Sequence, residues 1–166
     1  MTRKVGGAVV QGTDLHVITV TPVLTSSTDD SYVANDYIGT STTPITFAGV
    51  VDKDGASGFI LGAALVDDDL QSVAGELWLF DTTFAPPADS AAWTISDAIA
   101  ATCIGVIPFS TYYASALNSV SQGIPEAPLP FKCGSSVNDI YGAFVTRGAP
   151  NYTIGGLTFR LFTVES

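Results

Sequence analysis

The sequence predicts an all-β protein, an antiparallel two-sheet sandwich or jelly roll of about eight strands with one short helix. Short runs of apolar, β-branched and aromatic residues recur along the chain, and clusters of Gly, Pro, Asp and Ser separate them roughly every ten residues. Only one window has a helical pattern. No repeat, low-complexity tract or linker divides the chain, so we expect one domain over 13–166, preceded by an arm at 1–12.

The first half of the chain contains a series of predicted strands. Residues 15–24 partly alternate between apolar and polar side chains and are rich in β-branched residues, which favours a strand. The polar cluster at 25–31 predicts a turn. A tighter turn is expected at 52–57, where Gly55 is free to adopt a positive φ. The predicted strands are 15–24, 32–38, 43–51, 59–66 and 73–80, the second of them short and broken.

The second half begins with the helical window, residues 90–102. Ser96 or Thr94 is suited to cap a short helix that continues to Ala101. The segment 123–134 contains three prolines, so we expect a stiff extended loop or a sheet edge there. The other segments are predicted strands at 103–109, 139–147 and 156–164, and a stretch at 111–118 that fits neither pattern clearly.

The stretch 75–93, GELWLFDTTFAPPADSAAW, joins a strand to a proline-containing loop. Side chains alternate along a strand, so Glu76 and Asp81 lie on opposite faces and cannot form a catalytic pair with each other. The same alternation predicts that the leucines face the core and that the loop or helix after the strand covers the aromatic residues. The first set is Leu77 and Leu79, and the second is Trp78 and Phe80.

No constellation of residues supports catalysis, and we expect no enzymatic activity. The chain has one histidine, His16, and no GxSxG nucleophile motif. Cys103 and Cys133 lie in apolar or strand contexts, where thiols are usually inert, and two free thiols are favoured over a disulfide. An enzyme would require His16 to meet a Cys or Ser, or distant carboxylates such as Asp81 and Asp97 to converge.

The sequence predicts no metal site and no cofactor. Residues 52–55, Asp-Lys-Asp-Gly, resemble the start of a calcium loop, but the twelfth position is Ala63, where such a loop needs Glu. A turn is therefore the preferred interpretation of this segment. Two cysteines without CxxC spacing and one histidine do not make a zinc site by themselves. No phosphate-binding glycine motif occurs.

The charge balance limits the partners. Six Lys and Arg against sixteen Asp and Glu give a net charge of −10, which argues against nucleic acid and anionic membrane as partners and favours a cationic or neutral protein surface. Only 13% of the residues are charged, about half the usual share, and such a low share hints at assembly. We expect no signal peptide and no transmembrane helix, because no long apolar run occurs.

Six segments from Ser57 to the C-terminus, about two thirds of the chain, together resemble a known family. They are SGFILGAALVD (57–67), GELWLFDTTFAPPADSAAWTISDA (75–98), GVIPF (105–109), LPFKC (129–133), DIYGAFVTRGAPNY (139–152) and LTFRLF (157–162). The chain resembles the small head proteins that are often encoded beside the major capsid gene of tailed bacteriophages and act as cement or decoration proteins. The first 56 residues carry no such resemblance.

The resemblance implies a jelly-roll-like sandwich that is made in the host cytoplasm and binds the capsid exterior. Its partners would be the major capsid protein and further copies of itself, as a homodimer or homotrimer, since both suit a lattice with local symmetry axes. It carries no catalytic residues to transfer. A carbohydrate-binding jelly-roll module for host or surface adhesion is the alternative function.

We expect the partner contacts in three places. The first is the N-terminal arm, whose basic residues we expect to reach a neighbouring molecule. The second is the stiff loop before the helix. The third is a pair of adjacent tyrosines near a loop, because aromatic side chains often anchor interfaces. The candidate partner-binding residues are Arg3, Lys4, Phe84, Pro86, Pro87, Trp93, Tyr112 and Tyr113.

Overall fold

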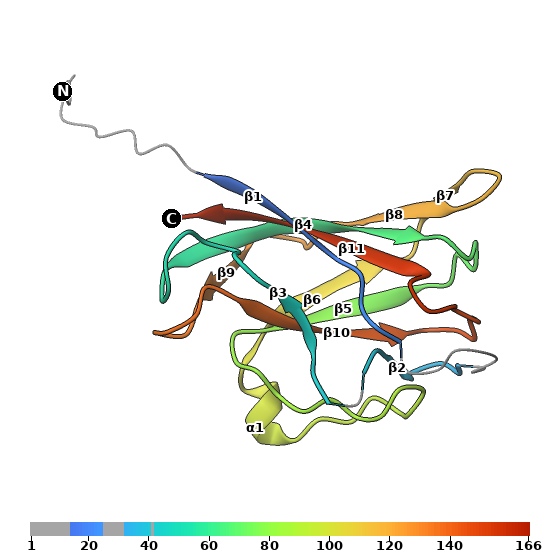
Figure 1. Ribbon diagram of the computed structural model, residues 1–166, viewed down its shortest axis with the longest axis horizontal. Coiled ribbons are helices and arrows are strands. Elements are labelled where there is room, and N and C mark those ends of the chain that lie inside the picture. Colours follow the sequence, from blue (N-terminus) through green and yellow to red (C-terminus); the bar gives the residue numbers. More distant parts are fainter. Residues whose placement is uncertain (1–13, 25–31, 41) are drawn as a thin grey trace.

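The computed structural model describes residues 14–24, 32–40 and 42–166 and confirms the predicted fold class (Figure 1). Within these ranges the chain forms two antiparallel sheets that lie face to face as a sandwich. The predicted arm at 1–12, with Arg3 and Lys4, and the predicted turn at 25–31 lie outside the described residues. No helix in the described ranges is long and apolar enough to cross a membrane.

The six-stranded sheet is built around its longest strand, β4. Its order is β1-β11-β4-β8-β7, and β9 lies beside the first part of β4, where it pairs with residues 57–60 while β8 pairs with residues 63–67. The strands are β1 Leu15–Val20, β4 Ser57–Asp67, β7 Tyr112–Ala114, β8 Ser119–Gly123, β9 Leu129–Lys132 and β11 Leu157–Glu165.

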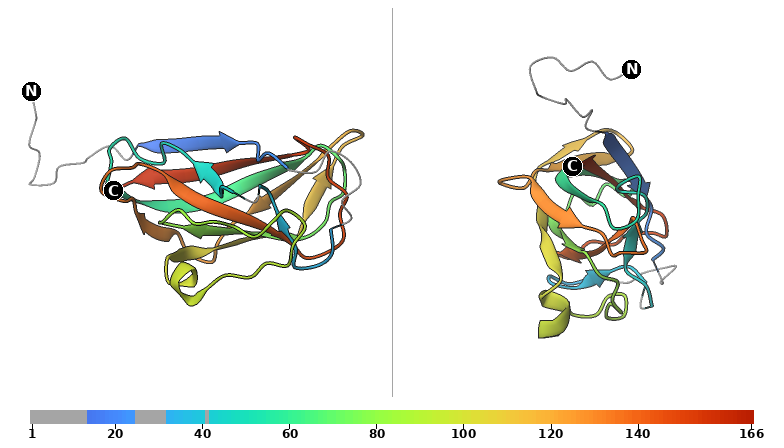
Figure 2. Two further views of the ribbon diagram at one scale, coloured as in Figure 1. Left: turned by 60° about the horizontal axis from the view of Figure 1, so that its bottom comes forward. Right: turned by 90° about the vertical axis from the view of Figure 1, so that its left-hand side faces the viewer.

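The five-stranded sheet has the order β2-β10-β5-β6, with β3 on the same edge of β10 as β2. Its strands are β2 Tyr37–Ile38, β3 Ile45–Phe47, β5 Gly75–Phe80, β6 Cys103–Phe109 and β10 Ile140–Thr146. Figure 2 shows the two sheets as separate layers, with the helix on the far side of the five-stranded sheet.

The main core fills the space between the sheets. Leu77 and Leu79 of β5 are fully buried in it, as strand alternation predicts. Three phenylalanines meet at its centre: the ring centroids of Phe109 and Phe144 are 6.3 Å apart, and those of Phe144 and Phe159 are 5.1 Å apart. This core couples β6 and β10 of one sheet to β11 of the other.

A second, smaller cluster lies on the outer side of the five-stranded sheet, under residues 81–102, which we call the cover segment. The segment contains helix α1, Asp97–Ala100, whose first turn is capped by Ser96: its hydroxyl oxygen accepts the Ile99 N–H at 3.3 Å. The predicted cap and helix are thus confirmed. The buried members of the cluster are Tyr37, Phe80 and Ala143, and Trp78, Phe84, Trp93, Ile95 and Ile99 pack against them.

The structure differs from the predicted elements in several places: the strands expected at 32–38 and 43–51 shorten to β2 and β3, and strands form where none was predicted. The stretch 111–118 contains β7 and a hairpin turn, and β8, with the sequence SVSQG, was not predicted as a strand. Its small and polar residues carry no local strand signal, and pairing with β4 defines it. The turn at 52–57 forms as expected, with Gly55 at a φ of 71°.

Candidate interaction surface

The outer side of the six-stranded sheet differs from that of the five-stranded sheet because no described segment covers it (Figures 1 and 2). Cross-strand partners share one face of a sheet. One such row crosses four strands: Leu15 of β1 lies opposite Val164 of β11, which lies opposite Phe59 of β4, which lies opposite Pro130 of β9. All four side chains of this row are apolar.

The next row continues the same apolar character. Val17 of β1 lies opposite Phe162 of β11, and the register between β11 and β4 then shifts, so that Leu61 is left as the extra residue of β4. Bulges of this kind turn an additional side chain out of the regular ladder. We call these two rows and the bulge residue the apolar face; its members are Leu15, Val17, Phe59, Leu61, Pro130, Phe162 and Val164.

Much of the apolar face is open to solvent. Leu15 is 63% exposed, Val17 45%, Phe59 43% and Leu61 40%. These four residues lie on the two strands that flank β11, whose Phe162 and Val164 join them, so they differ from single exposed apolar side chains, which are normal on any protein surface. A contiguous apolar patch on a sheet is typical of a surface that binds another protein.

The charges on this side of the sheet have the opposite sign to the chain as a whole. Arg160 lies in the next row, opposite Thr19, and Lys132 lies at the end of β9. The six strands of this sheet contain two acidic residues, Asp67 and Glu165. Asp67 lies opposite Leu157 and Glu165 lies opposite Gly58, and both positions belong to the inward-facing side of the sheet. The outward side of the described strands therefore carries two cations and no carboxylate. Depletion of charge at the centre of a patch is typical of interface cores.

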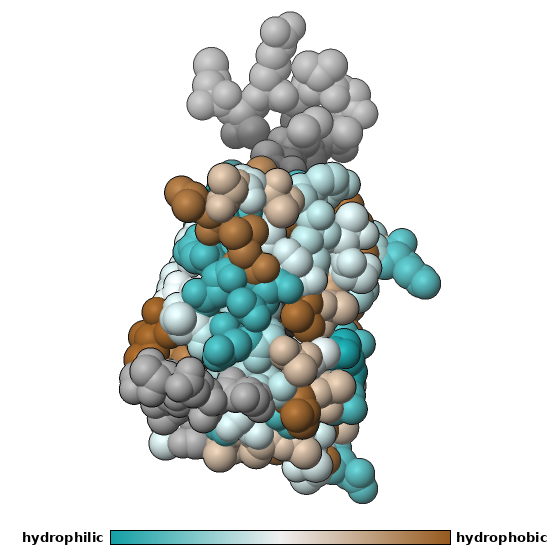
Figure 3. Space-filling model, turned by 90° about the vertical axis from the view of Figure 1, so that its right-hand side faces the viewer, coloured by the Kyte–Doolittle hydropathy of each residue, from teal (hydrophilic) through white to brown (hydrophobic). Residues whose placement is uncertain are grey.

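The loop end of the sandwich, at the right of Figure 1, is less suited to binding a flat partner. Asp67 organises it: its carboxylate accepts the Ser72 N–H at 2.6 Å and the Asp69 N–H at 3.1 Å. Leu70 and Ser72 have positive φ values of 54° and 50°, so this turn is strained. Figure 3 views this end and shows hydrophobic patches that are separated by hydrophilic side chains.

The predicted contact residues of the 84–93 loop take part in internal packing. Phe84 and Trp93 lie in the outer cluster, with ring centroids 6.3 Å apart, and Trp93 stacks on Tyr37 at 5.9 Å. Pro86 is buried and Pro87 is half-buried. The indole N–H of Trp93 is buried and has no hydrogen-bond partner within the part of the chain that the structure describes. Contact between this loop and a partner stays a prediction, but most of its aromatic surface is already in use.

The two adjacent tyrosines have different roles. The Tyr112 hydroxyl points inward and donates to the carbonyl oxygen of Val73 at 2.6 Å, and burial, followed by the charge of Asp67, raises its pKa. Tyr113 is 71% exposed and lies opposite Val120 on the outer side of the six-stranded sheet. Of the predicted contact residues that the structure describes, Tyr113 is therefore the one that shares a side with the apolar face.

The residues considered for catalysis do not form an activated nucleophile. Cys103 and Cys133 are both free, as predicted. Burial raises the pKa of the Cys103 thiol. Burial, followed by the negative charge of Asp139, raises the pKa of the Cys133 thiol to about 11. Both are therefore protonated at neutral pH, whereas the thiolate is the reactive form.

Sequence reasoning missed the apolar face, although a signal was present. In LHVITV, apolar residues occupy both odd and even positions and therefore both faces of the strand, and in FILGAALV the apolar run is continuous. A strand with one solvated face should alternate, so apolar residues at both parities indicate a second contact surface. No protein-family model, no curated protein and no solved structure matches the chain.

Proposed function

We propose that this chain is a non-catalytic virion protein that docks on the outside of a tailed-phage capsid and cements neighbouring capsomers. The observation that carries the proposal is the apolar face on the uncovered side of the six-stranded sheet. The class of partner comes from the resemblance of segments between residues 57 and 162 to phage head proteins. Homodimers or homotrimers at the local symmetry axes of the shell are part of this proposal.

The chemistry of the apolar face suits such docking. Removing apolar side chains from water favours association, and a face without carboxylates leaves no anion to be desolvated at the contact. Most of the acidic residues, which give the chain its charge of −10, would remain in solvent. Binding to the assembled shell but not to free subunits would stabilise the shell by mass action.

The two cations favour a shell surface over a second copy of the same face. A face-to-face dimer would bring Arg160 and Lys132 of one copy toward the same two residues of the other. A neutral or acidic shell surface has no such repulsion. We therefore assign the apolar face to the capsid contact and self-association to other surfaces.

The test is cosedimentation of the full chain with capsids of the phage that the proposal assigns to it. We expect the wild type to bind and both Val17→Asp and Phe59→Asp to weaken binding at least tenfold, since each buries a charge in the contact. Leu117→Asp is the matched control because Leu117 is 80% exposed but lies at the tip of the β7–β8 hairpin. Absence of binding at low and moderate salt, or equal loss in the control, would overturn the proposal.

The alternative, a carbohydrate-binding module, has less support. It predicts solvent-facing aromatic rings that gather in one groove, where they can stack on sugars. A groove of about 700 Å³ lies between β6, the 124–128 loop and the start of β9. Val106, Ile124 and Leu129 are among the residues that line it, and none of its lining residues is aromatic. A glycan array probed with the purified chain distinguishes the two functions.

A further inference from the structure

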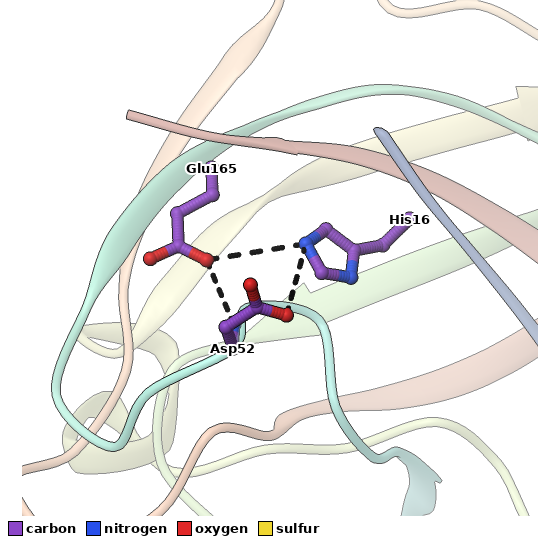
Figure 4. A group of neighbouring side chains, drawn as sticks. All are labelled: His16, Asp52 and Glu165. Carbon is purple, nitrogen blue, oxygen red and sulfur yellow. Dashed lines mark hydrogen bonds and ion pairs between the residues drawn. The ribbon is translucent and has the colours of Figure 1, made fainter. Parts of the chain in front are cut away.

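Three side chains from distant parts of the sequence converge at the end of the sandwich near the C-terminus. They are His16 of β1, Asp52 of the turn after β3 and Glu165 of β11 (Figure 4). The Nε2 atom of His16 is 3.9 Å from Oδ1 of Asp52 and 3.9 Å from Oε2 of Glu165. The three ligand atoms all lie within 4.8 Å of one another.

The imidazole nitrogen at this site has no hydrogen-bond partner among the described residues. Nε2 of His16 is buried, and the side chain as a whole is 17% exposed. Figure 4 shows this nitrogen pointing toward the gap between the two carboxylates. Leaving a buried polar atom unsatisfied is costly, so such an atom indicates a missing partner.

The carboxylate of Glu165 is held in place by the backbone. Its Oε2 accepts the Asp52 N–H at 2.8 Å, which ties β11 to the turn. Strand pairing fixes the other side, because His16 lies opposite Thr163, two residues before Glu165. Asp52, by contrast, is 62% exposed on its turn and has room to adjust. Two ligands are therefore positioned by the fold, and the third can move to close the site.

We propose that His16, Asp52 and Glu165 bind one divalent transition-metal cation, for which Zn²⁺ is the best-suited probe. One imidazole and two carboxylates match the ligands that Zn²⁺ takes, whereas Ca²⁺ prefers oxygen ligands alone. Tetrahedral Zn²⁺ with bonds of about 2.0–2.2 Å places its ligand atoms roughly 3.3–3.5 Å apart. The two 3.9 Å separations from Nε2 need a contraction of about half an ångström. The two carboxylate oxygens lie within 4.8 Å of each other, and the exposed Asp52 would have to move toward Glu165 to close the site.

The cation would join three segments at the edge of the six-stranded sheet. β1 is the edge strand, and within the described chain its paired neighbour is β11. A metal clip between β1, the turn at Asp52 and the end of β11 would restrain this edge, and the exposed side of Asp52 leaves a coordination position for water. The site does not rest on the proposed capsid function.

The experiment titrates the full, untagged chain with ZnCl₂ after treatment with a chelator. Calorimetry should show one Zn²⁺ per chain, and NMR of the imidazole should show a shift of Nε2, which is unambiguous because His16 is the one histidine. We expect Asp52→Asn and Glu165→Gln each to weaken binding about tenfold or more. Asp54→Asn, an exposed carboxylate in the same turn, is the matched control and should bind as the wild type does.

Asp52→Asn keeps the test decisive even where Glu165→Gln does not fold, because Asp52 is largely exposed. If no saturable binding is seen up to about 1 mM Zn²⁺, the proposal is overturned, because a Kd above that concentration is too weak for a site that the fold has preformed. Binding without a shift of the His16 resonance, or equal weakening in Asp54→Asn and Asp52→Asn, would overturn it too, because the ion would then bind elsewhere.

Discussion

The two outer sides of the sandwich carry similar apolar rows, but only one of them is covered by the described chain. On the five-stranded sheet, Trp78 and Phe80 project outward, and the cover segment packs Phe84, Trp93 and Ile99 against them. On the six-stranded sheet, the apolar face projects outward in the same way and stays open. Both sheets therefore have two apolar sides, and the difference lies in what packs against the outer one.

The outward-facing apolar and aromatic residues of the two sheets look alike in the sequence but have different roles. Those under the cover segment stabilise the fold, because they are removed from water within the chain itself. Those on the apolar face contribute little to folding while they remain exposed, and they become buried when a partner docks. Substitutions on the two sides should therefore change different quantities.

The largest expected effect is the loss of a ring under the cover segment. Phe80 is fully buried, and its ring centroid is 4.6 Å from that of Phe84. Phe80→Ala should lower the free energy of unfolding by about 3–5 kcal/mol, measured by urea denaturation. Phe59→Ala removes the same ring from the apolar face, where it is 43% exposed, and should cost less than half as much. Equal costs at the two positions would contradict the comparison.

Much of the fold on the covered side could be predicted from the sequence because its signals are local. The period of two in β5 assigns Leu77 and Leu79 to the core and Trp78 to the cover segment, and Ser96 caps the helix as expected. The strand β8 could not be predicted, because its residues become a strand only by pairing with β4.

The two sites proposed for function depend on contacts between distant segments. The apolar face requires the register of β1, β11, β4 and β9, which no local pattern specifies. The cluster of His16, Asp52 and Glu165 joins an edge strand, a turn and the last strand. In the sequence, His16 is a single histidine in a strand. The segment that begins at Asp52 resembles only the start of a calcium loop, and a turn is the preferred interpretation. No local pattern links these residues to each other or to Glu165 until the sheet brings them together.

A smaller effect is expected at the rim of the covered cluster. Trp78 is half-buried; its ring centroid is 5.9 Å from that of Trp93, and its Nε1–H donates to Glu76 at 3.1 Å. Replacing a fully buried tryptophan by Ala costs about 3–5 kcal/mol. Partial exposure reduces the expected cost to about 2–3 kcal/mol in urea denaturation. A cost as large as that of Phe80→Ala would show that the cover segment depends on both rings equally.

The smallest expected effect is a pH-dependent change in stability on the covered side. That side carries the ion pair of Glu76 and Arg147, whereas the apolar face has no carboxylate whose titration could change the stability. Glu76 accepts hydrogen bonds from Arg147 and Trp78; the bond from Arg147 is the main cause that lowers the pKa of Glu76, and burial opposes it. A lowered folded-state pKa stabilises the protein above the ordinary Glu pKa of about 4.3, and this contribution is lost as the pH falls through the lower, folded value.

Glu76→Gln should therefore cost up to about 1 kcal/mol at pH 7, and the difference from wild type should vanish in acid. Glu126 is exposed on the 124–128 loop, so Glu126→Gln is the control and should leave the urea midpoint unchanged at both pH values. A cost for Glu76→Gln that persists at low pH would assign its effect to packing instead of charge.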